Sequence, residues 1–182
     1  MTYHVTAHAV AEARLVGDDA DRERFLAQLQ TVAQGCGWTC LAVCLLDTHY
    51  HLLVRISETN LARGMQRLNG CYAQFFNLRY GRKGHLFGGR YHGGKILSPA
   101  HLLLAVRYIA RNARDTGADP ARYRWSSYPG LIGTRRCWPF IARENVLALF
   151  GGTDTAVQLL REFIEDDHPN RSPTAATGVR PP

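Results

Sequence analysis

His49 and His51 flank Tyr50 in a short apolar run over residues 48–54. Because side chains alternate along a β-strand, the two histidines would point to the same side and Tyr50 to the other. The apolar residues that alternate with them are Tyr50, Leu52, Val54 and Ile56. Neighbouring imidazoles can bind a divalent metal ion. The pattern therefore predicts a strand with one face for the core and one for metal chemistry.

Two histidines at this spacing are also common as ordinary surface or core residues, so a second motif matters. Tyr108 and Asn112 are four residues apart within a helical pattern and would share a helix face. A tyrosine hydroxyl can attack a phosphodiester, and a carboxamide oxygen can complete a metal site begun by two imidazoles. Without the histidines, a packed tyrosine and a capping asparagine would explain the same residues. Positive charge near the tyrosine is expected from Arg107, Arg111 and Arg114.

Composition favours a globular protein with an acidic partner. The chain has 182 residues, of which 46% are hydrophobic, enough for one domain with a sizeable core. A net charge of +7 favours phosphate-rich partners. An odd count of 5 cysteines, with no signal peptide, argues against a disulfide framework. No apolar run approaches the roughly 20 residues of a membrane span, so a cytoplasmic protein is expected.

The periodicity along the chain predicts seven main elements. Strands are expected at residues 3–10, 38–46, 49–56 and 93–97, and helices at 21–34, 61–80 and 101–114. Helix ends are indicated by Gly35 and Gly37, and helix starts by Asn60 and by Ser98 before Pro99. The order β-α-β-β-α-β-α predicts an α+β fold, a ferredoxin-like sandwich with helices on one face of an antiparallel sheet.

The remaining residues predict a short helical C-terminal extension. Short helices are expected at residues 145–150 and 155–166. Residues from 168 onward are rich in Pro, Ser, Thr and Gly and are expected to be disordered. The predicted organisation is a catalytic domain over residues 1–133, the extension over 134–167 and a tail over 168–182.

Several motifs occur in an order that resembles the IS200-like transposases, within the HUH single-strand endonuclease superfamily. The similarity is greater to their REP-associated tyrosine transposase branch and covers roughly residues 2–133. The matching runs are residues 3–7 (YHVTA), 21–25 (DRERF), 48–54 (THYHLLV), 60–70 (NLARGMQRLNG), 84–91 (GHLFGGRY), 107–112 (RYIARN) and 125–128 (WSSY). Departures from the family pattern are Thr48, Ala113 and His8, where Asn, Pro and Arg are usual.

The resemblance implies a mechanism and a cofactor. His49 and His51 would be metal ligands, Asn112 the third, and the ion Mg²⁺ or Mn²⁺. Tyr108 would attack a DNA phosphate, leaving a free 3′-OH and a 5′-phosphotyrosine link that a second 3′-OH can resolve. The expected substrate is single-stranded or hairpin DNA of the kind found in repetitive extragenic palindromes. A monomer is favoured and a homodimer stays open, as does whether the tyrosine acts in its own chain.

Binding such DNA requires positive charge and stacking surfaces. Stacking is expected from Tyr91 or Phe87, and further charge from Arg135, Arg136 and Arg143. The main DNA-binding candidates are Arg63, Arg67, Arg82, Lys83, Arg90 and Lys95.

Two other functions are compatible with these residues. One is a domesticated protein that holds hairpin DNA without cutting it. The other is an unrelated metallohydrolase that combines the two histidines with a carboxylate such as Asp47. The latter would form no covalent adduct and would not need the Tyr108 hydroxyl.

Overall fold

A four-stranded antiparallel sheet lies at the centre of the molecule. The computed structural model describes residues 1–11, 13–152 and 154–166. The strands are β1 (Thr2–His8), β2 (Thr39–Leu45), β3 (His49–Arg55) and β4 (His92–Lys95), in the spatial order β2-β3-β1-β4. With α1 (Asp19–Cys36) between β1 and β2 and α2 (Leu61–Arg79) between β3 and β4, this order gives a ferredoxin-like sandwich. The predicted fold class is confirmed.

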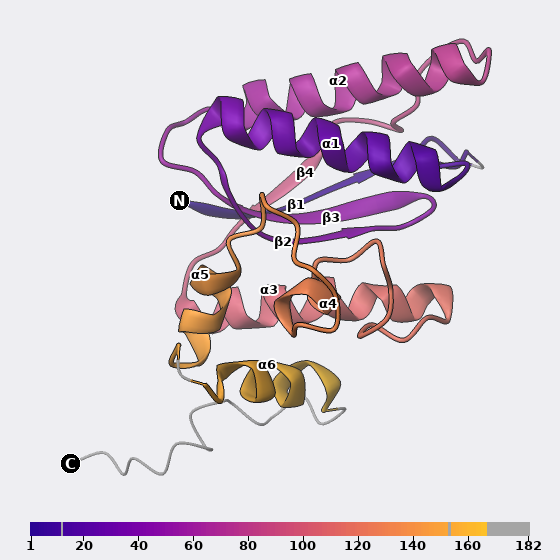
Figure 1. Ribbon diagram of the computed structural model, residues 1–182. Coiled ribbons are helices and arrows are strands. Elements are labelled where there is room, and N and C mark those ends of the chain that lie inside the picture. Colours follow the sequence, from indigo (N-terminus) through magenta and orange to yellow (C-terminus); the bar gives the residue numbers. More distant parts are fainter. Residues whose placement is uncertain (12, 153, 167–182) are drawn as a thin grey trace.

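Helices cover both faces of the sheet, which differs from the expected single face (Figure 1). On one face of β3, the Tyr50 ring contacts Phe25 of α1 and its hydroxyl donates to Asn69 of α2. The opposite face is covered by α3 (Pro99–Arg111), whose Tyr108 ring lies against His51. The histidine face needs a covering helix because it also carries an apolar side chain. Leu53 lies on this face and is fully buried, shielded from water.

Where the sequence predicts a capping residue, the helix begins or ends at that residue in most cases. Asp18 caps α1 by accepting from the Asp21 amide at 3.1 Å, and Gly37, with φ of 64°, ends it. Ser98 caps α3, with Pro99 in the first turn. Asn60 precedes α2 but makes no side-chain cap. Its amide instead bonds the Cys36 carbonyl, and its oxygen accepts from the indole of Trp38 at 2.8 Å.

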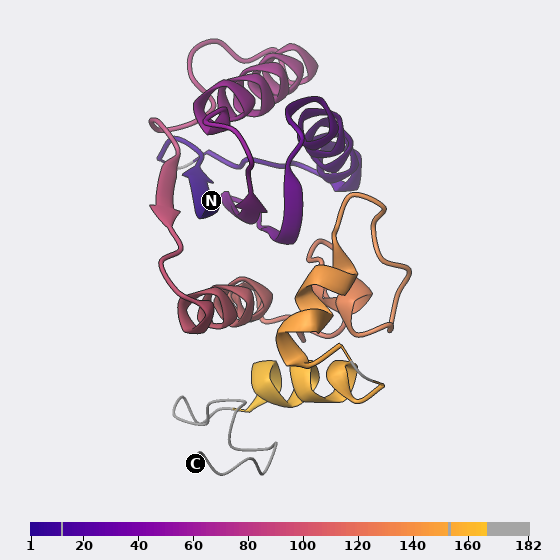
Figure 2. The ribbon, with the colours of Figure 1, turned by 90° about the vertical axis from the view of Figure 1, so that its left-hand side faces the viewer.

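The C-terminal part packs beside β2 and beneath α3 (Figures 1 and 2). The Ser127 amide donates to the Val43 carbonyl, and the Ala142 amide donates to the Cys40 carbonyl at 2.8 Å. Backbone bonds at both places cover the outer edge of the sheet. The elements here are η1 (Asn112–Thr116), α4 (Tyr128–Leu131), α5 (Arg143–Leu147), η2 (Ala148–Phe150) and α6 (Ala156–Glu165).

The first expected short helix corresponds to α5 together with η2 and the second to α6, and the four-residue α4 was not foreseen. The expected tail over residues 168–182 lies outside the described residues. The division at residue 133 stays a prediction. Within the described part of the chain, no helix combines the length and apolarity that crossing a membrane requires.

Candidate active site

Four histidines from two adjacent strands gather on the sheet face that α3 covers. The register pairs His8 of β1 with His49 of β3, and Thr6 with His51. The His8 and His49 rings are stacked, with centroids 4.5 Å apart. His4 lies diagonally from His51, with its Nε2 atom 3.0 Å from Nδ1 of His51. The predicted histidine strand is therefore flanked by a second one.

Tyr108 reaches this cluster from α3, and Asn112 reaches it from the position directly after that helix. The Tyr108 ring lies 5.3 Å from the His51 ring and 5.6 Å from the His4 ring, and 54% of its surface is exposed. Asn112 is buried, and its Nδ2 donates to the Tyr108 carbonyl at 2.7 Å, which leaves its oxygen on the other side of the amide. The structure thus brings together the four residues on which the predicted chemistry depends.

Burial keeps the site imidazoles neutral. It lowers the pKa of His51 to about 3, helped by His4, His49 and His8, while the nearby Asn112 carboxamide acts in the opposite direction. The pKa values of His49 and His4 are also lowered, in each case mainly by burial. At neutral pH these rings therefore hold free lone pairs, the form that binds metal ions.

The donor set fits a divalent ion that keeps open positions. Nε2 of His51 is buried and has no hydrogen-bond partner in the described part of the chain. In the same residues, no group of three or more His, Cys, Asp or Glu side chains could hold a metal. Two imidazoles and the Asn112 carboxamide would therefore leave part of the shell to water or phosphate oxygens, as Mg²⁺ and Mn²⁺ commonly require.

His4 and His8 were not among the predicted site residues. The alternation of His4, Thr6 and His8 along the first strand placed them on one side, which was the available signal. The sequence did not predict the pairing register of β1 with β3, which places His4 and His8 beside His49 and His51. This register arises from strands more than 40 residues apart in the chain.

Two arginines expected to supply charge near Tyr108 have a different role. Arg107 is only 8% exposed and bonds the Asp166 carbonyl, with its guanidinium over the Phe163 ring of α6. Arg111 bonds the same carbonyl at 3.0 Å. These two guanidinium groups tie α6 to α3, and a contribution of their charge near Tyr108 stays a prediction.

Asp47 is also engaged elsewhere. Its carboxylate pairs with Arg14 at 3.1 Å and with Arg22. A carboxylate held between two guanidinium groups is poorly placed to ligate an ion. This arrangement disfavours the metallohydrolase in which Asp47 would join the histidines.

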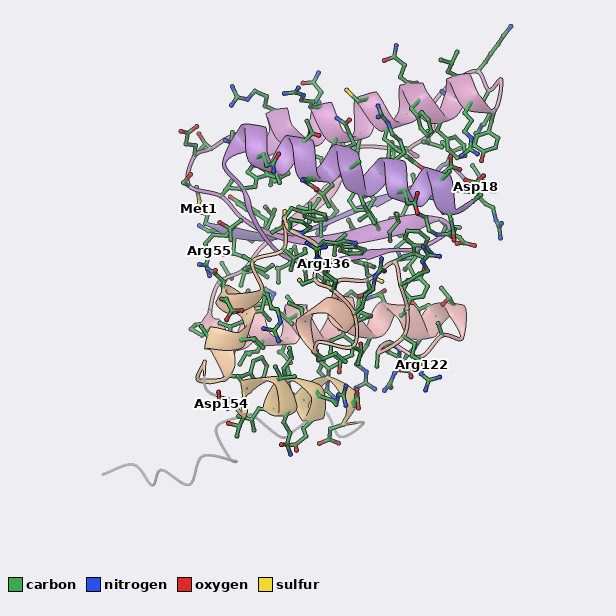
Figure 3. The ribbon with its side chains drawn as sticks, in the orientation of Figure 1. Met1, Asp18, Arg55, Arg122, Arg136 and Asp154 are labelled. Atoms are coloured by element: carbon green, nitrogen blue, oxygen red, sulfur yellow. The ribbon has the colours of Figure 1, made fainter. Side chains whose placement is uncertain are left out.

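The predicted DNA-binding residues are dispersed. Arg63 and Arg67 lie exposed on α2, on the face of the sheet opposite Tyr108. Lys95 of β4 pairs with Tyr3 and so points to that same side of the sheet. Side chains fill both layers between sheet and helices, so the two faces are separate surfaces (Figure 3). Lys83 and Arg90 are exposed in the loop before β4, and Arg82 is partly buried.

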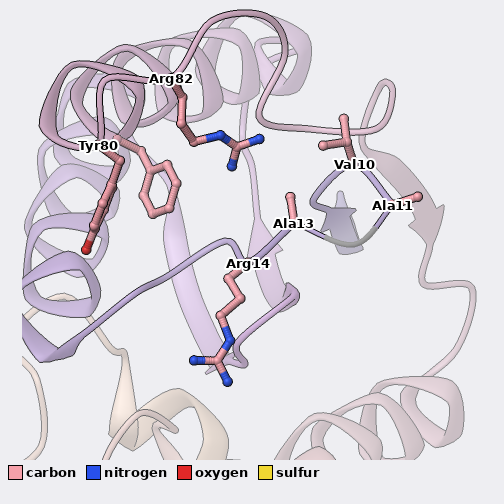
Figure 4. A pocket seen from close by; sticks show the side chains of 7 residues that line it. Val10, Ala11, Ala13, Arg14, Tyr80 and Arg82 are labelled. Atoms are coloured by element: carbon pink, nitrogen blue, oxygen red, sulfur yellow. The ribbon is translucent and has the colours of Figure 1, made fainter.

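Arg82 belongs to a hollow of about 410 Å³ at the end of the sheet (Figure 4). Arg14 and Arg82 lie on its two sides, and Tyr80 contributes an aromatic wall. The loop that lines it follows His8 directly, and the Ala9 amide donates to the Thr48 carbonyl at 2.8 Å. The hollow therefore adjoins the end of the sheet where His8 and His49 pair.

Comparison with known proteins identifies the class of protein that this fold and site define. The family model described as "Transposase IS200 like" matches residues 1–112. The chain belongs to this transposase family. No curated protein matches the chain.

Two solved structures are similar to it. A structure of a REP-associated tyrosine transposase bound to a REP hairpin has 14% sequence identity and a TM-score of 0.61, covering 76% of this chain and 82% of that one. A Deinococcus radiodurans R1 protein described as a transposase has 14% identity and a TM-score of 0.45, covering 57% and 85%. At this identity the first similarity supports the fold.

Proposed function

We propose that this protein is a metal-dependent endonuclease and strand transferase that acts on single-stranded or hairpin DNA through a covalent 5′-phosphotyrosine. The observation that carries the proposal is the contact of the Tyr108 ring with His51, beside Asn112, within a single chain. The same contact supports a tyrosine that acts in its own chain and so favours a monomer. Membership of the REP-associated branch is part of the proposal.

Each residue has a defined part in the reaction. His49, His51 and Asn112 would hold Mg²⁺ or Mn²⁺, which would supply charge stabilisation at the scissile phosphate. The Tyr108 hydroxyl loses its proton and its oxygen forms a bond to phosphorus as the bond from phosphorus to O3′ breaks, and O3′ takes up a proton. Tyr108 is half exposed, as a nucleophile for a macromolecular substrate must be.

The DNA contact that the geometry favours is the hollow between Arg14 and Arg82. Guanidinium groups suit phosphate, and the Tyr80 wall suits an unpaired base. Its place beside the His8 and His49 end of the sheet would put bound DNA next to the site. The REP hairpin bound by the similar structure agrees with this substrate class. The dispersed Arg63 and Arg67 would contact, at most, a distant part of a hairpin.

The test is a denaturing gel of labelled hairpin DNA incubated with Mn²⁺, comparing the wild-type protein with Tyr108→Phe. We expect a metal-dependent covalent protein–DNA band that disappears in the variant, while hairpin affinity changes little. Tyr3→Phe is the matched control, because Tyr3 points to the opposite side of the sheet from His4. It should keep the band.

Two results would contradict the proposal. Tight hairpin binding with no adduct and no cleavage would favour a domesticated binding protein. Cleavage that persists in Tyr108→Phe would assign the attack to a water molecule instead of the tyrosine.

A further inference from the structure

Among the four described histidines of the site, His4 and His51 form the one hydrogen bond between two rings. Its Nε2 lies 3.0 Å from Nδ1 of His51, with ring centroids 5.2 Å apart. His8 and His49 are closer, at 4.5 Å, but they stack at an interplanar angle of 15° with no ring hydrogen bond between them. The two pairs occupy the same strands and the same face, yet only His4 can control where its neighbour carries a proton.

A neutral imidazole carries its proton on one of its two nitrogens. If His51 carried it on Nε2, an N–H group would be buried with no partner at hydrogen-bond geometry in the described part of the chain, although the Asn112 carboxamide lies nearby. If the proton is on Nδ1, it is donated to Nε2 of His4, and Nε2 of His51 keeps a lone pair. The observed contacts favour the second arrangement, because every N–H of His51 then has a partner.

The same arrangement also determines which nitrogen of His4 carries a proton. To accept from His51, Nε2 of His4 must be unprotonated, so its own proton lies on Nδ1. The ring is only partly buried, which allows that N–H to be solvated. His4 also contacts the edge of the Tyr108 ring at 5.6 Å. It therefore lies between the strand that carries the ligands and the helix that carries the tyrosine.

We propose that His4 is a positioning residue that holds His51 as the Nδ1–H tautomer and so presents the Nε2 lone pair to the metal ion. The ligand role of His51 rests on the proposed function, whereas the tautomer does not. Partners of this kind orient metal-bound imidazoles in many proteins, and their loss typically weakens metal affinity by roughly 10–100-fold.

The first measurement is the tautomer of His51 in the metal-free protein, from long-range ¹H–¹⁵N NMR correlations. We expect the Nδ1–H form in the wild-type protein for both His51 and His4. In His4→Phe, which keeps an aromatic ring but has no acceptor, His51 should lose its exclusive Nδ1–H form. His4→Gln should restore it, because the Gln carboxamide oxygen lies as many bonds from Cβ as Nε2 of His does.

His8→Phe is the matched control. It makes the same substitution on the same strand and face, next to the other site histidine. We expect the His51 tautomer to be unchanged in it. An altered tautomer in both Phe variants would mean that general packing sets it, and the proposal would be wrong.

The second measurement is Mn²⁺ affinity, from electron paramagnetic resonance of the free ion. We expect roughly 10–100-fold weaker binding in His4→Phe and recovery in His4→Gln. A wild-type His51 protonated on Nε2 would overturn the proposal before any variant is made. A protein with the expected tautomer that binds no metal would contradict the proposed function while supporting the role of His4 in orienting His51.

Discussion

His51 links the chemistry of the site to the acid stability of the protein. Its ring is 4% exposed, and burial lowers its pKa to about 3 from an ordinary value of 6.5. Below pH 6.5 the unfolded chain binds a proton at this residue that the folded chain does not bind. The folded state must therefore lose stability as the pH falls from 6.5 towards 3.

For metal-free protein, we expect this one residue to reduce the free energy of unfolding by roughly 2 kcal/mol between pH 6.5 and pH 5. Urea unfolding at several pH values would measure the loss. In His51→Gln the slope of stability against pH should be shallower in this window. The control His85→Gln, at an exposed position, should keep the wild-type slope. Equal slopes in both variants would contradict a buried neutral His51.

The residues of the candidate site could be predicted where a local periodicity determines which side of a strand or helix they occupy. The two-residue period placed His49 and His51 together, and the helical period did the same for Tyr108 and Asn112. Interactions that depend on tertiary register could not be predicted. This applies to the His4 bond to His51 and to the Arg107 bond to the Asp166 carbonyl. Both need elements whose contact no local pattern determines.

Helix α2 contains two glycines that differ in what surrounds them. A Cβ atom at Gly64 would lie 2.1 Å from the Trp38 ring, so the absence of a side chain lets the indole pack against the helix. Trp38 is held there by its bond to Asn60. A Cβ atom at Gly70 would meet nothing within 4 Å.

These surroundings predict opposite effects for one substitution. Gly64→Ala should destabilise the protein by about 1–3 kcal/mol, because the buried indole must move. Gly70→Ala should stabilise it by up to about 1 kcal/mol, because alanine is the better helix former. Thermal or urea unfolding of both variants checks this. Equal effects would mean that the indole is not confined by α2.

Element types were easier to predict than their arrangement. The four strands and three long helices are all present, with ends displaced by a few residues from the predicted ones. The expectation that helices cover a single face was wrong, because it relied on the apolar side of β3 formed by Tyr50, Leu52 and Val54. The burial of Leu53, between the histidines and Arg55, depends on a helix that follows some 45 residues later.

The stability of the whole molecule depends on its C-terminal part. Residues of α6 that are fully buried include Leu160 and Ile164, and the end of this helix is bonded by Arg107 and Arg111 of α3. Since α3 also carries Tyr108, the C-terminal helix supports the element that presents the proposed nucleophile. This support lies outside the 1–112 segment that the family model matches.

A chain that ends after residue 154 should therefore be much less stable. Burial of Leu160 and Ile164 alone contributes about 3–6 kcal/mol. Differential scanning calorimetry should find a clearly lower unfolding temperature than for a chain that ends at Asp166, which keeps the described contacts of α6. An unchanged unfolding temperature in the chain that ends at 154 would show that the packing of α6 on α3 does not stabilise the protein.

The order of the elements along the chain has a consequence for how the protein is made. His4, His8, His49 and His51 are synthesised before residue 56, whereas the helix that covers them begins only at Pro99. A nascent chain thus exposes the apolar and histidine-bearing face of its sheet to the ribosome surface and to chaperones until α3 emerges. It also lacks Tyr108 throughout this interval. On the proposed mechanism, the protein could not attack DNA before the helix that covers the histidine face has been synthesised, so the shielding of this face and the onset of reactivity would coincide.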